Sequence, residues 1–396
     1  MTLKKVTLIL IPFLLAAVII GYTPKSTETA AYNVKKENFN IDGYLEENHA
    51  EINLKSASGF SLLDEGMKKS DVILAGKSGG LDENYQLKLS LLKYLNKKQD
   101  VRYLLEELGY SESSLINEYL KSGNEEYLKQ VYENKSGPVI YTDQENAYHN
   151  KKSYIFWNEL RKYNHTLPEG KKITVIGIGA ENRVGTALKY LNSLLPKNEP
   201  DEEIKPFIKD LKNISSQKCL DGIINVIKKL ECSMESDPDE YRKYLGRRYF
   251  DFNLIADNIL NADKIYNASG TDMKKETELC MFNNFQTVYS PDGKYFGEFD
   301  MEHLYSKEVT GFSALLSSSD STVKGRVLSI GYASESNKSL VSAENLQVLK
   351  RSSKSDLTLF KLDGDNSPFN AKSYFFPDID GRSDKDHFKY LILIKS

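Results

Sequence analysis

Val72-Ile73-Leu74-Ala75-Gly76 is a short apolar run that leads directly into Lys77-Ser78-Gly79-Gly80. An apolar run of this length that ends at glycines is typical of a buried β-strand. Leucines then recur at helical spacing from Leu87 to Leu95, and a second strand is predicted over Val101–Glu107. This order of strand, helix and strand predicts a βαβ unit with a parallel pair of strands.

The same alternation continues along the chain. Further core strands are predicted over Lys171–Gly177, Lys294–Gly297, Gly325–Ile330 and Tyr390–Ile394. Amphipathic helices are predicted over residues 111–121, 125–134, 153–163 and 184–195, and a charged helical stretch over 201–275. The predicted fold class is therefore α/β, with a central, mostly parallel sheet flanked by helices and a helical insertion or cap.

The N-terminus has the pattern of a targeting segment. Lys4 and Lys5 precede the apolar run Val6–Gly21, which only Thr7 interrupts, and small residues around Ala31 suit cleavage. A lipoprotein is disfavoured because Gly21-Tyr22 stands where a lipidated Cys is needed. We expect residues 1–31 to be a signal peptide or a membrane anchor, 32–70 a tether and lead-in, and 71–396 the globular domain. The predicted location is extracytoplasmic, with membrane contact only through the N-terminal segment.

Composition excludes several functional classes. The net charge of −3 leaves no electrostatic footprint for nucleic acid. Three cysteines are too few for a disulfide framework, although Cys219 and Cys232 are left as either a pair or free thiols. With five histidines, no HExxH and no paired Cys motif, neither a structural metal site nor a cofactor is expected. The same scarcity of His and Cys disfavours haem handling.

Two glycine-containing turns and one charged pair are candidates for chemistry. Gly177–Gly185 follows a strand and opens a helix, but its glycine spacing does not fit dinucleotide binding, so a tight turn is predicted. Lys77 and Ser78 stand where ligands bind in open α/β sheets; as strand neighbours they point to opposite faces, which disfavours a nucleophile pair. Arg102 and Glu106 share one face of the next strand, where they could hold a water or a carbonyl, or form an ordinary ion pair.

Taken together, these segments resemble the erythromycin-esterase-like family. Val72–Gly76 and the loop after it resemble that family's Gly-Glu-x-His-Gly region, and Val101–Glu106 resembles its strand with an Arg and a Glu. Phe156–Asn164 is similar to its Trp-x-x-x-Arg-x-Tyr-Asn helix, and Met281–Phe285 with Lys294–His303 to its late helix and His-bearing strand. The resemblance implies an esterase-like α/β domain in which a loop Glu and His, an Arg/Glu pair and a late His surround a water that attacks an ester.

This sequence departs from that pattern at the site itself. Lys77 stands at the family's Glu position, Gly79 at its His position and Gly179 where an Asp is usual. Glycine cannot transfer a proton, and loss of an essential base typically costs about 10²–10⁴-fold in rate. Whether the chain is an enzyme is therefore left open. The favoured hypothesis is a catalytically degenerate protein that binds a small molecule through Lys77, Ser78 and Glu181. The alternative is a divergent hydrolase of esters or lactones that uses His303 with Arg102 and Glu106.

Overall fold

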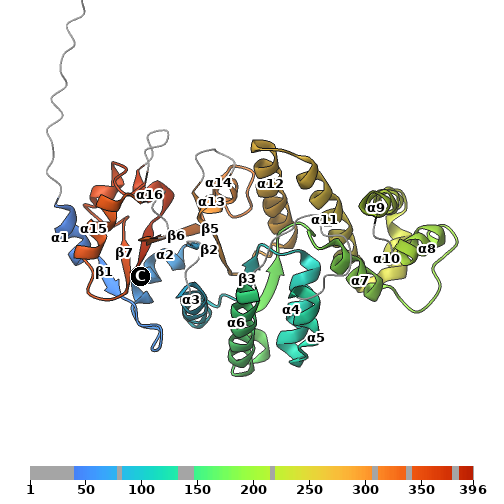
Figure 1. The fold of residues 1–396 in the computed structure, drawn as a ribbon, viewed down its shortest axis with the longest axis horizontal. Helices are drawn as coiled ribbons and strands as arrows, with labels where there is room; N and C mark the ends of the chain where they lie inside the picture. Colours follow the sequence, from blue (N-terminus) through green and yellow to red (C-terminus); the bar gives the residue numbers. More distant parts are fainter. Residues whose placement is uncertain are drawn as a thin grey trace, which may run out of the picture. The chain divides into compact units, whose positions relative to one another are not determined.

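The computed structural model describes residues 40–77, 83–132, 147–214, 219–305, 311–335, 341–376 and 383–395 (Figure 1). The predicted targeting segment lies outside the described residues. Within the described ranges, no helix is both long and apolar enough to cross a membrane.

In the described ranges the strands form one eight-stranded sheet, in the order β1-β7-β8-β6-β2-β5-β3-β4. The strands are β1 (His49–Glu51), β2 (Val72–Lys77), β3 (Tyr103–Glu106), β4 (Thr174–Gly177), β5 (Tyr295–Asp300), β6 (Val327–Ser334), β7 (Leu357–Lys361) and β8 (Tyr390–Ile394). The strands from β8 to β4 are mutually parallel, and β7 and β1 add an antiparallel edge. The predicted mostly parallel α/β fold is confirmed.

The pairing of the first two core strands differs from the prediction. β2 and β3 are parallel members of one sheet, but β5 lies between them and pairs with both. Apolar runs in the sequence identify strands, whereas the insertion of a strand from almost two hundred residues later is a tertiary event that local patterns do not encode. The consequence is that the ends of β2, β5 and β3 stand side by side.

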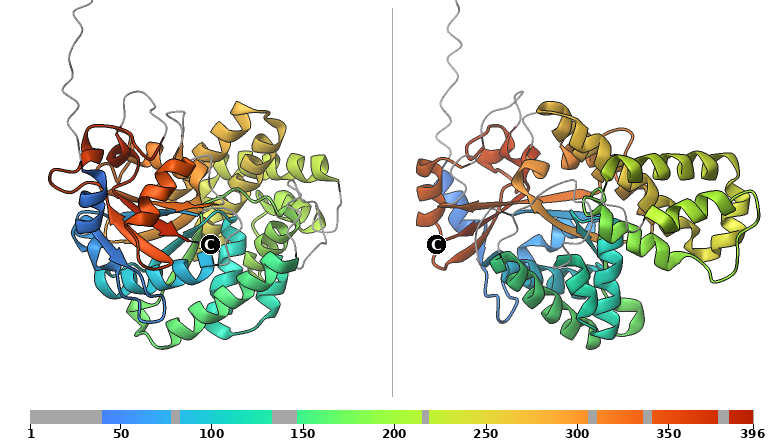
Figure 2. Two further views of the ribbon diagram at one scale, coloured as in Figure 1. Left: turned by 60° about the vertical axis from the view of Figure 1, so that its left-hand side comes forward. Right: turned by 45° about the vertical axis from the view of Figure 1, so that its right-hand side comes forward.

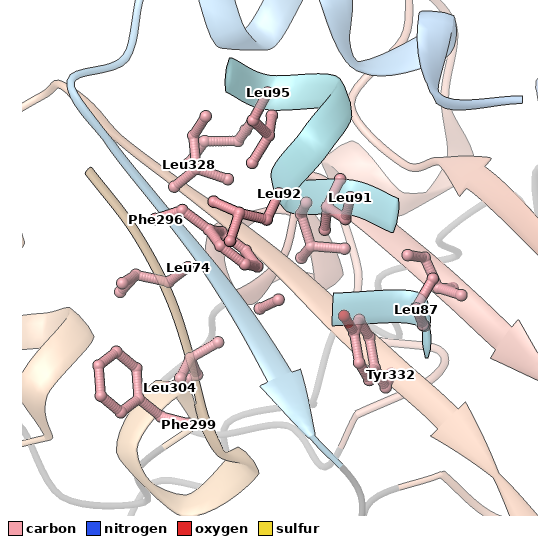
Figure 3. Close-up of a cluster of buried hydrophobic side chains, with 14 of the residues drawn as sticks. Leu74, Leu87, Leu91, Leu92, Leu95, Phe296, Phe299, Leu304, Leu328 and Tyr332 are labelled. Atoms are coloured by element: carbon pink, nitrogen blue, oxygen red, sulfur yellow. The ribbon is translucent and has the colours of Figure 1, made fainter. Parts of the chain in front are cut away.

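Helix α3 (Glu83–Gln99) covers one face of this sheet. Leu87, Leu91, Leu92 and Leu95 are fully buried, and Figure 3 shows them packed toward Phe296, Leu328 and Tyr332. Because strand side chains alternate between faces, residues at even steps from Phe296 on β5 also point toward α3. Burial of each leucine stabilises the fold by about 2 kcal/mol.

The opposite face is covered by α12 (Thr271–Val288), α13 (Met301–Leu304) and α14 (Phe312–Ser317). Phe312 makes edge-to-face ring contacts with Phe285 of α12 and Phe299 of β5. In Figure 3, Leu74, Phe299 and Leu304 lie on the side of the sheet away from α3. These contacts fix α13, which immediately follows β5, against the ends of β2 and β5.

Most of the other helices lie around these layers, whereas those within residues 205–245 extend from one end of the body (Figure 1 and Figure 2). The other helices are α1 (Ile41–Glu47), α2 (Asp64–Lys68), α4 (Tyr110–Ser122), α5 (Glu126–Tyr132), α6 (Ala147–His165), α7 (Val184–Leu194), α8 (Lys205–Ile214), α9 (Leu220–Ser236), α10 (Pro238–Leu245), α11 (Tyr249–Asn267), α15 (Ala343–Arg351) and α16 (Asp384–His387). The family-like helix α6 is a scaffold element, because Asn164 at its end hydrogen-bonds both the N–H and the carbonyl of Ile173.

The predicted helical elaboration is present as helices α8 to α12. It has a second hydrophobic core, formed by residues such as Ile208, Ile227 and Ile255 from α8, α9 and α11. Cys219 precedes α9 and Cys232 lies near its end, which separates the two by roughly 20 Å along the helix. Both are free thiols, so the pairing that the sequence left open does not form.

Residues 40–70 are part of the body and not a loose lead-in. β1 pairs with β7, and Phe60, Leu63 and Met67 are fully buried. The pattern is weak in the sequence because β1 is short and lies at a sheet edge, where only one side of the strand pairs.

Candidate functional site

Charged residues gather where β2, β5 and β3 end. Lys77 is the last residue of β2 and lies level with Asp300, the last residue of β5. Glu106 ends β3, Glu107 follows it, and His303 lies in α13 just beyond β5. Parallel strands end at one edge of a sheet, so the register itself brings these residues together. This edge is where open α/β sheets bind ligands.

His303 is held between two carboxylates. Its Nδ1 lies 2.8 Å from Oε1 of Glu278 on α12, and its Nε2 lies 3.4 Å from Oε2 of Glu107. The His303 side chain is 12% exposed and Glu278 only 1%, whereas Glu107 is 39% exposed. The second oxygen of Glu278 accepts the backbone N–H of Phe312 at 2.7 Å. Glu278 therefore ties the imidazole to both α12 and the start of α14.

This arrangement stabilises the charged form of the imidazole. Burial by itself would lower the pKa of His303, but the hydrogen bonds and charges of Glu107 and Glu278 outweigh it and raise the pKa to about 10. Reciprocally, burial would raise the pKa of Glu107, but His303 and Lys77 lower it. An imidazolium donates from both ring nitrogens, which matches the two acceptors that it faces.

Among the described residues of this edge, Lys77 is the cation most exposed to solvent. Its side chain is 40% exposed and its Nζ lies 3.6 Å from Oδ1 of Asp300, which is 56% exposed. Burial would lower the Lys77 pKa, but Asp300, Glu107 and Glu298 raise it above its ordinary value. Lys77 is thus a permanently charged ammonium and not a nucleophilic amine.

Glu106 faces α3 and not His303. Its Oε1 lies 2.6 Å from Nζ of Lys88, with side chains 13% and 10% exposed. Lys88 also lies over the ring of Phe156, 5.0 Å from its centroid. The expected partnership of Glu106 with His303 is therefore replaced by that of its neighbour Glu107, because successive residues of a strand point to opposite faces.

Glu298 is a further acid within the sheet, 5% exposed. Its Oε2 accepts a hydrogen bond of 3.4 Å from the hydroxyl of Tyr332 on β6. Burial raises the pKa of Glu298 to about 7, although Lys88 and Lys77 act in the opposite direction. A carboxyl group with such a pKa exchanges its proton at neutral pH.

Two predicted site residues lie elsewhere. Arg102 precedes β3 and donates a hydrogen bond to the carbonyl of Gly170. It therefore lies where β3 begins, about 13 Å along the strand from Glu106, where β3 ends. Glu181 is fully buried, where its two oxygens accept the N–H and the hydroxyl of Ser111 at 2.8 and 2.6 Å. Glu181 thus supplies hydrogen-bond acceptors to the first turn of α4, where backbone N–H groups have no partner within the helix. This role is structural. Ser78 and Gly79 lie outside the described residues.

Gly177 at the end of β4 and Gly179 just beyond it form a tight turn, as predicted. A Cβ at Gly177 would lie 2.3 Å from the carbonyl oxygen of Gly109, so only glycine allows the chains to approach. The N–H of Gly179 donates to the carbonyl of Leu108. The turn therefore packs against the chain that follows Glu107.

Sequence reasoning missed Glu107 and Asp300 at the strand ends, and it also missed three buried charged members of this edge cluster: Lys88, Glu278 and Glu298. Each interrupts a pattern of buried positions: Lys88 lies one turn before Leu92, Glu278 one turn before Met281, and Glu298 two residues after Phe296. A charged side chain is rarely buried without a specific partner. A charge on the apolar face of a predicted helix or strand was the signal that could have found them.

No protein-family model matches the chain, and no curated protein matches it by sequence. Solved structures do match. A Bacillus cereus protein aligns with a TM-score of 0.64 at 15% identity over 90% of this chain and 96% of its own. A mutant of the erythromycin esterase EreC in its open conformation aligns with a TM-score of 0.61 at 14% identity, over 87% of this chain and 94% of the esterase. The chain has the erythromycin-esterase fold.

A succinoglycan biosynthesis protein shares this esterase fold, with a TM-score of 0.64 at 14% identity over 90% of this chain and 96% of the other. The resemblance drawn from the sequence segments is thereby confirmed at the level of the fold. Sequence identities this low establish a shared fold but not a shared chemistry, so the function must be argued from the site.

Within the described part of the chain, no group of three or more His, Cys, Asp or Glu side chains is arranged to hold a metal ion.

Proposed function

We propose that this chain is an extracytoplasmic protein that binds a small molecule at the edge formed by β2, β5 and β3, and that it has lost the hydrolytic chemistry of an esterase. The observation that carries the proposal is the position of His303 between Glu278 and Glu107.

A general base must be deprotonated and must reach the water that it activates. With a pKa of about 10, His303 is neutral in only about one molecule in a thousand at pH 7. Both of its ring nitrogens already face carboxylates, so its proton is shared with Glu278 and Glu107. These two facts support a structural, positively charged His303 in place of a catalytic base.

The remaining edge groups suit binding. The site has a solvent-exposed rim formed by Lys77, Asp300 and Glu107, whose side chains are each between 39% and 56% exposed. Beneath this rim lie three less exposed residues, Lys88, Glu106 and Glu298. Charged groups with fixed partners are preorganised to orient a polar ligand. Lys77 also replaces an acid of the esterase-like pattern, which reverses the charge at that point of the rim.

Hydrolysis of p-nitrophenyl acetate and of a macrolactone tests the proposal. We expect no turnover above the rate of the His303→Ala variant. The matched control is His165→Ala, since His165 is exposed at the end of α6. Activity that His303→Ala abolishes and His165→Ala retains would overturn the proposal.

Location is tested separately. The run Val6–Gly21 behind Lys4 and Lys5 supports export. Fusion of residues 1–40 to alkaline phosphatase, which is active only after export, should give activity in a bacterial host. Replacement of two leucines of the run by arginine should abolish it, and an inactive wild-type fusion would contradict export.

A divergent hydrolase is the second candidate, favoured by the orientation that Glu278 gives to His303. A base oriented by a buried carboxylate is the arrangement that nucleophile or water activation needs. In that case the rate should rise with pH up to about 10 as His303 loses its proton. Arg102 takes no part in either candidate, so Arg102→Gln should leave binding and any activity unchanged.

A further inference from the structure

Glu298 lies on the face of the sheet that α3 covers. β2 and β5 align Ile73 with Phe296, Ala75 with Glu298 and Lys77 with Asp300. Side chains at alternate positions share a face, so Glu298 points to the same side as Phe296 and Lys77. Figure 3 shows Phe296 on the side of the α3 leucines. Glu298 therefore sits about 7 Å below the exposed Asp300, between the rim and the apolar core.

The cross-strand neighbour of this acid is Ala75, a buried residue with a small side chain on β2. Tyr332 of β6, the strand on the other side of β2, reaches over it and donates to Oε2 of Glu298. Tyr332 thus fixes the direction of the carboxylate, because a hydrogen bond to a charged group is directional and stronger than a neutral one.

The nearby cations already have carboxylate partners. Lys88 pairs with Glu106, His303 with Glu107 and Glu278, and Lys77 with Asp300. Among the described residues no ion pair reaches Glu298, and Tyr332 supplies its hydrogen bond. Counted over the described residues, these five acids and three cations leave two surplus negative charges, and Glu298 is the acid that no cation contacts. A buried carboxylate without a cation is costly, which is why burial raises its pKa to about 7.

We propose that Glu298 is the specificity-determining residue of the proposed binding site and that it binds an ammonium group of the ligand, with Tyr332 orienting its carboxylate. The inference rests on the proposed binding function and names the ligand class. An ammonium supplies the counter-charge that Glu298 lacks among the described residues. Protonation of Glu298 below neutral pH removes the attraction.

The test compares benzylamine with benzyl alcohol, which share a ring and differ in charge, by ligand-observed NMR with the full chain. At pH 8 benzylamine should bind about tenfold more tightly than benzyl alcohol. At pH 6 the benzylamine affinity should fall about tenfold, in proportion to the ionised fraction of Glu298. Glu298→Gln should abolish the preference. The matched control is Glu231→Gln, because burial also raises the pKa of Glu231, on α9 of the helical elaboration, to about 7.

Tyr332→Phe keeps the Glu298 carboxylate and removes its hydrogen bond. The affinity for benzylamine should therefore fall by about threefold, and the affinity for benzyl alcohol should not change. A preference for benzylamine that survives Glu298→Gln overturns the assignment. A wild-type protein that shows no such preference, or that binds neither probe, also overturns it. Benzyl alcohol binding without a preference would leave the binding function standing. Ester hydrolysis that depends on His303 would contradict the proposed function alone. Failure of the proposed function and failure of the Glu298 assignment are therefore distinguishable.

Discussion

Glu278 and His303 form a hydrogen bond of 2.8 Å between a carboxylate with 1% exposure and an imidazole with 12% exposure. The same carboxylate accepts the N–H of Phe312, so one side chain of α12 anchors both α13 and α14. This buried carboxylate thereby links α12 to the edge of the sheet. Perturbing that charge should change the site before it changes the fold.

Glu278→Gln should lower the pKa of His303 by about 1–3 pH units, because a neutral amide no longer stabilises the imidazolium. Proton–nitrogen correlation NMR of the imidazole across pH 6–11 measures it. Glu107→Gln is the matched comparison and should have the smaller effect, since Glu107 is more exposed and lies 3.4 Å from Nε2. An unchanged titration in both variants would show that these acids do not set the charge of His303.

Lys88→Met should destabilise the protein by about 3 kcal/mol, because it leaves the carboxylate of Glu106 buried without its cation. The double variant Lys88→Met with Glu106→Leu should recover most of that loss, since both charges are then absent. Urea unfolding measures both. Lys162→Met serves as the control, because its pair with Glu159 is exposed and worth under about 1 kcal/mol. A double variant as unstable as the single one would contradict this account.

The parts of the fold that sequence patterns reveal are those set by local burial. The runs that became β2, β3 and β8 are apolar because these strands are buried on both faces. β1 escaped detection because an edge strand leaves a weaker pattern, with Glu51 at its end. β7 pairs with both β1 and β8, and it escaped detection because Thr358 and Lys361 interrupt its short apolar run. The position of β5 between β2 and β3 depends on contacts between distant segments, which no local pattern contains.

The candidate site was predicted in part for the same reason. Lys77, Glu106 and His303, which the sequence singles out one by one, lie at one edge because parallel strands end together. Arg102 was misplaced because β3 begins after it. Glu106 was chosen in place of Glu107 because the face to which a residue at the end of a strand points depends on the register of that strand. Glu298 was not predicted because its local signal is one charge within an apolar strand and its partner Tyr332 lies in a distant segment.

Glu181→Gln should flatten the dependence of stability on pH between about 4.5 and 8. Burial raises the pKa of Glu181 to about 8 in the folded protein, from an ordinary value of 4.5. The folded state therefore holds a proton that the unfolded state releases, so this contribution is complete below pH 4.5 and is lost as pH rises toward 8. The slope per proton is at most ~1.4 kcal/mol per pH unit.

Urea unfolding at pH 4.5, 6.5 and 8 measures this slope. The variant should match the wild type to within about 1 kcal/mol at pH 4.5, since Gln resembles the protonated acid and still accepts from Ser111. At pH 8 the variant should be the more stable protein. A steeper fall in the variant would mean that Glu181 is ionised in the fold.

The three cysteines should react as two fast thiols and one slow thiol, even in protein isolated without reductant. Cys219 and Cys232 are exposed, and the helix between them holds them too far apart for a disulfide, which requires Cα atoms within about 7 Å. Cys280 is buried in α12, where burial and the charge of Asp257 raise its pKa to about 12, so little thiolate forms below that pH. Titration with a chromogenic disulfide at pH 8 should release two equivalents from the native protein and the third only in denaturant. Cys219→Ser and Cys232→Ser should each remove one fast equivalent. If native protein released none before reduction and two after it, the two thiols would be paired, and α9 could not be a continuous helix between them.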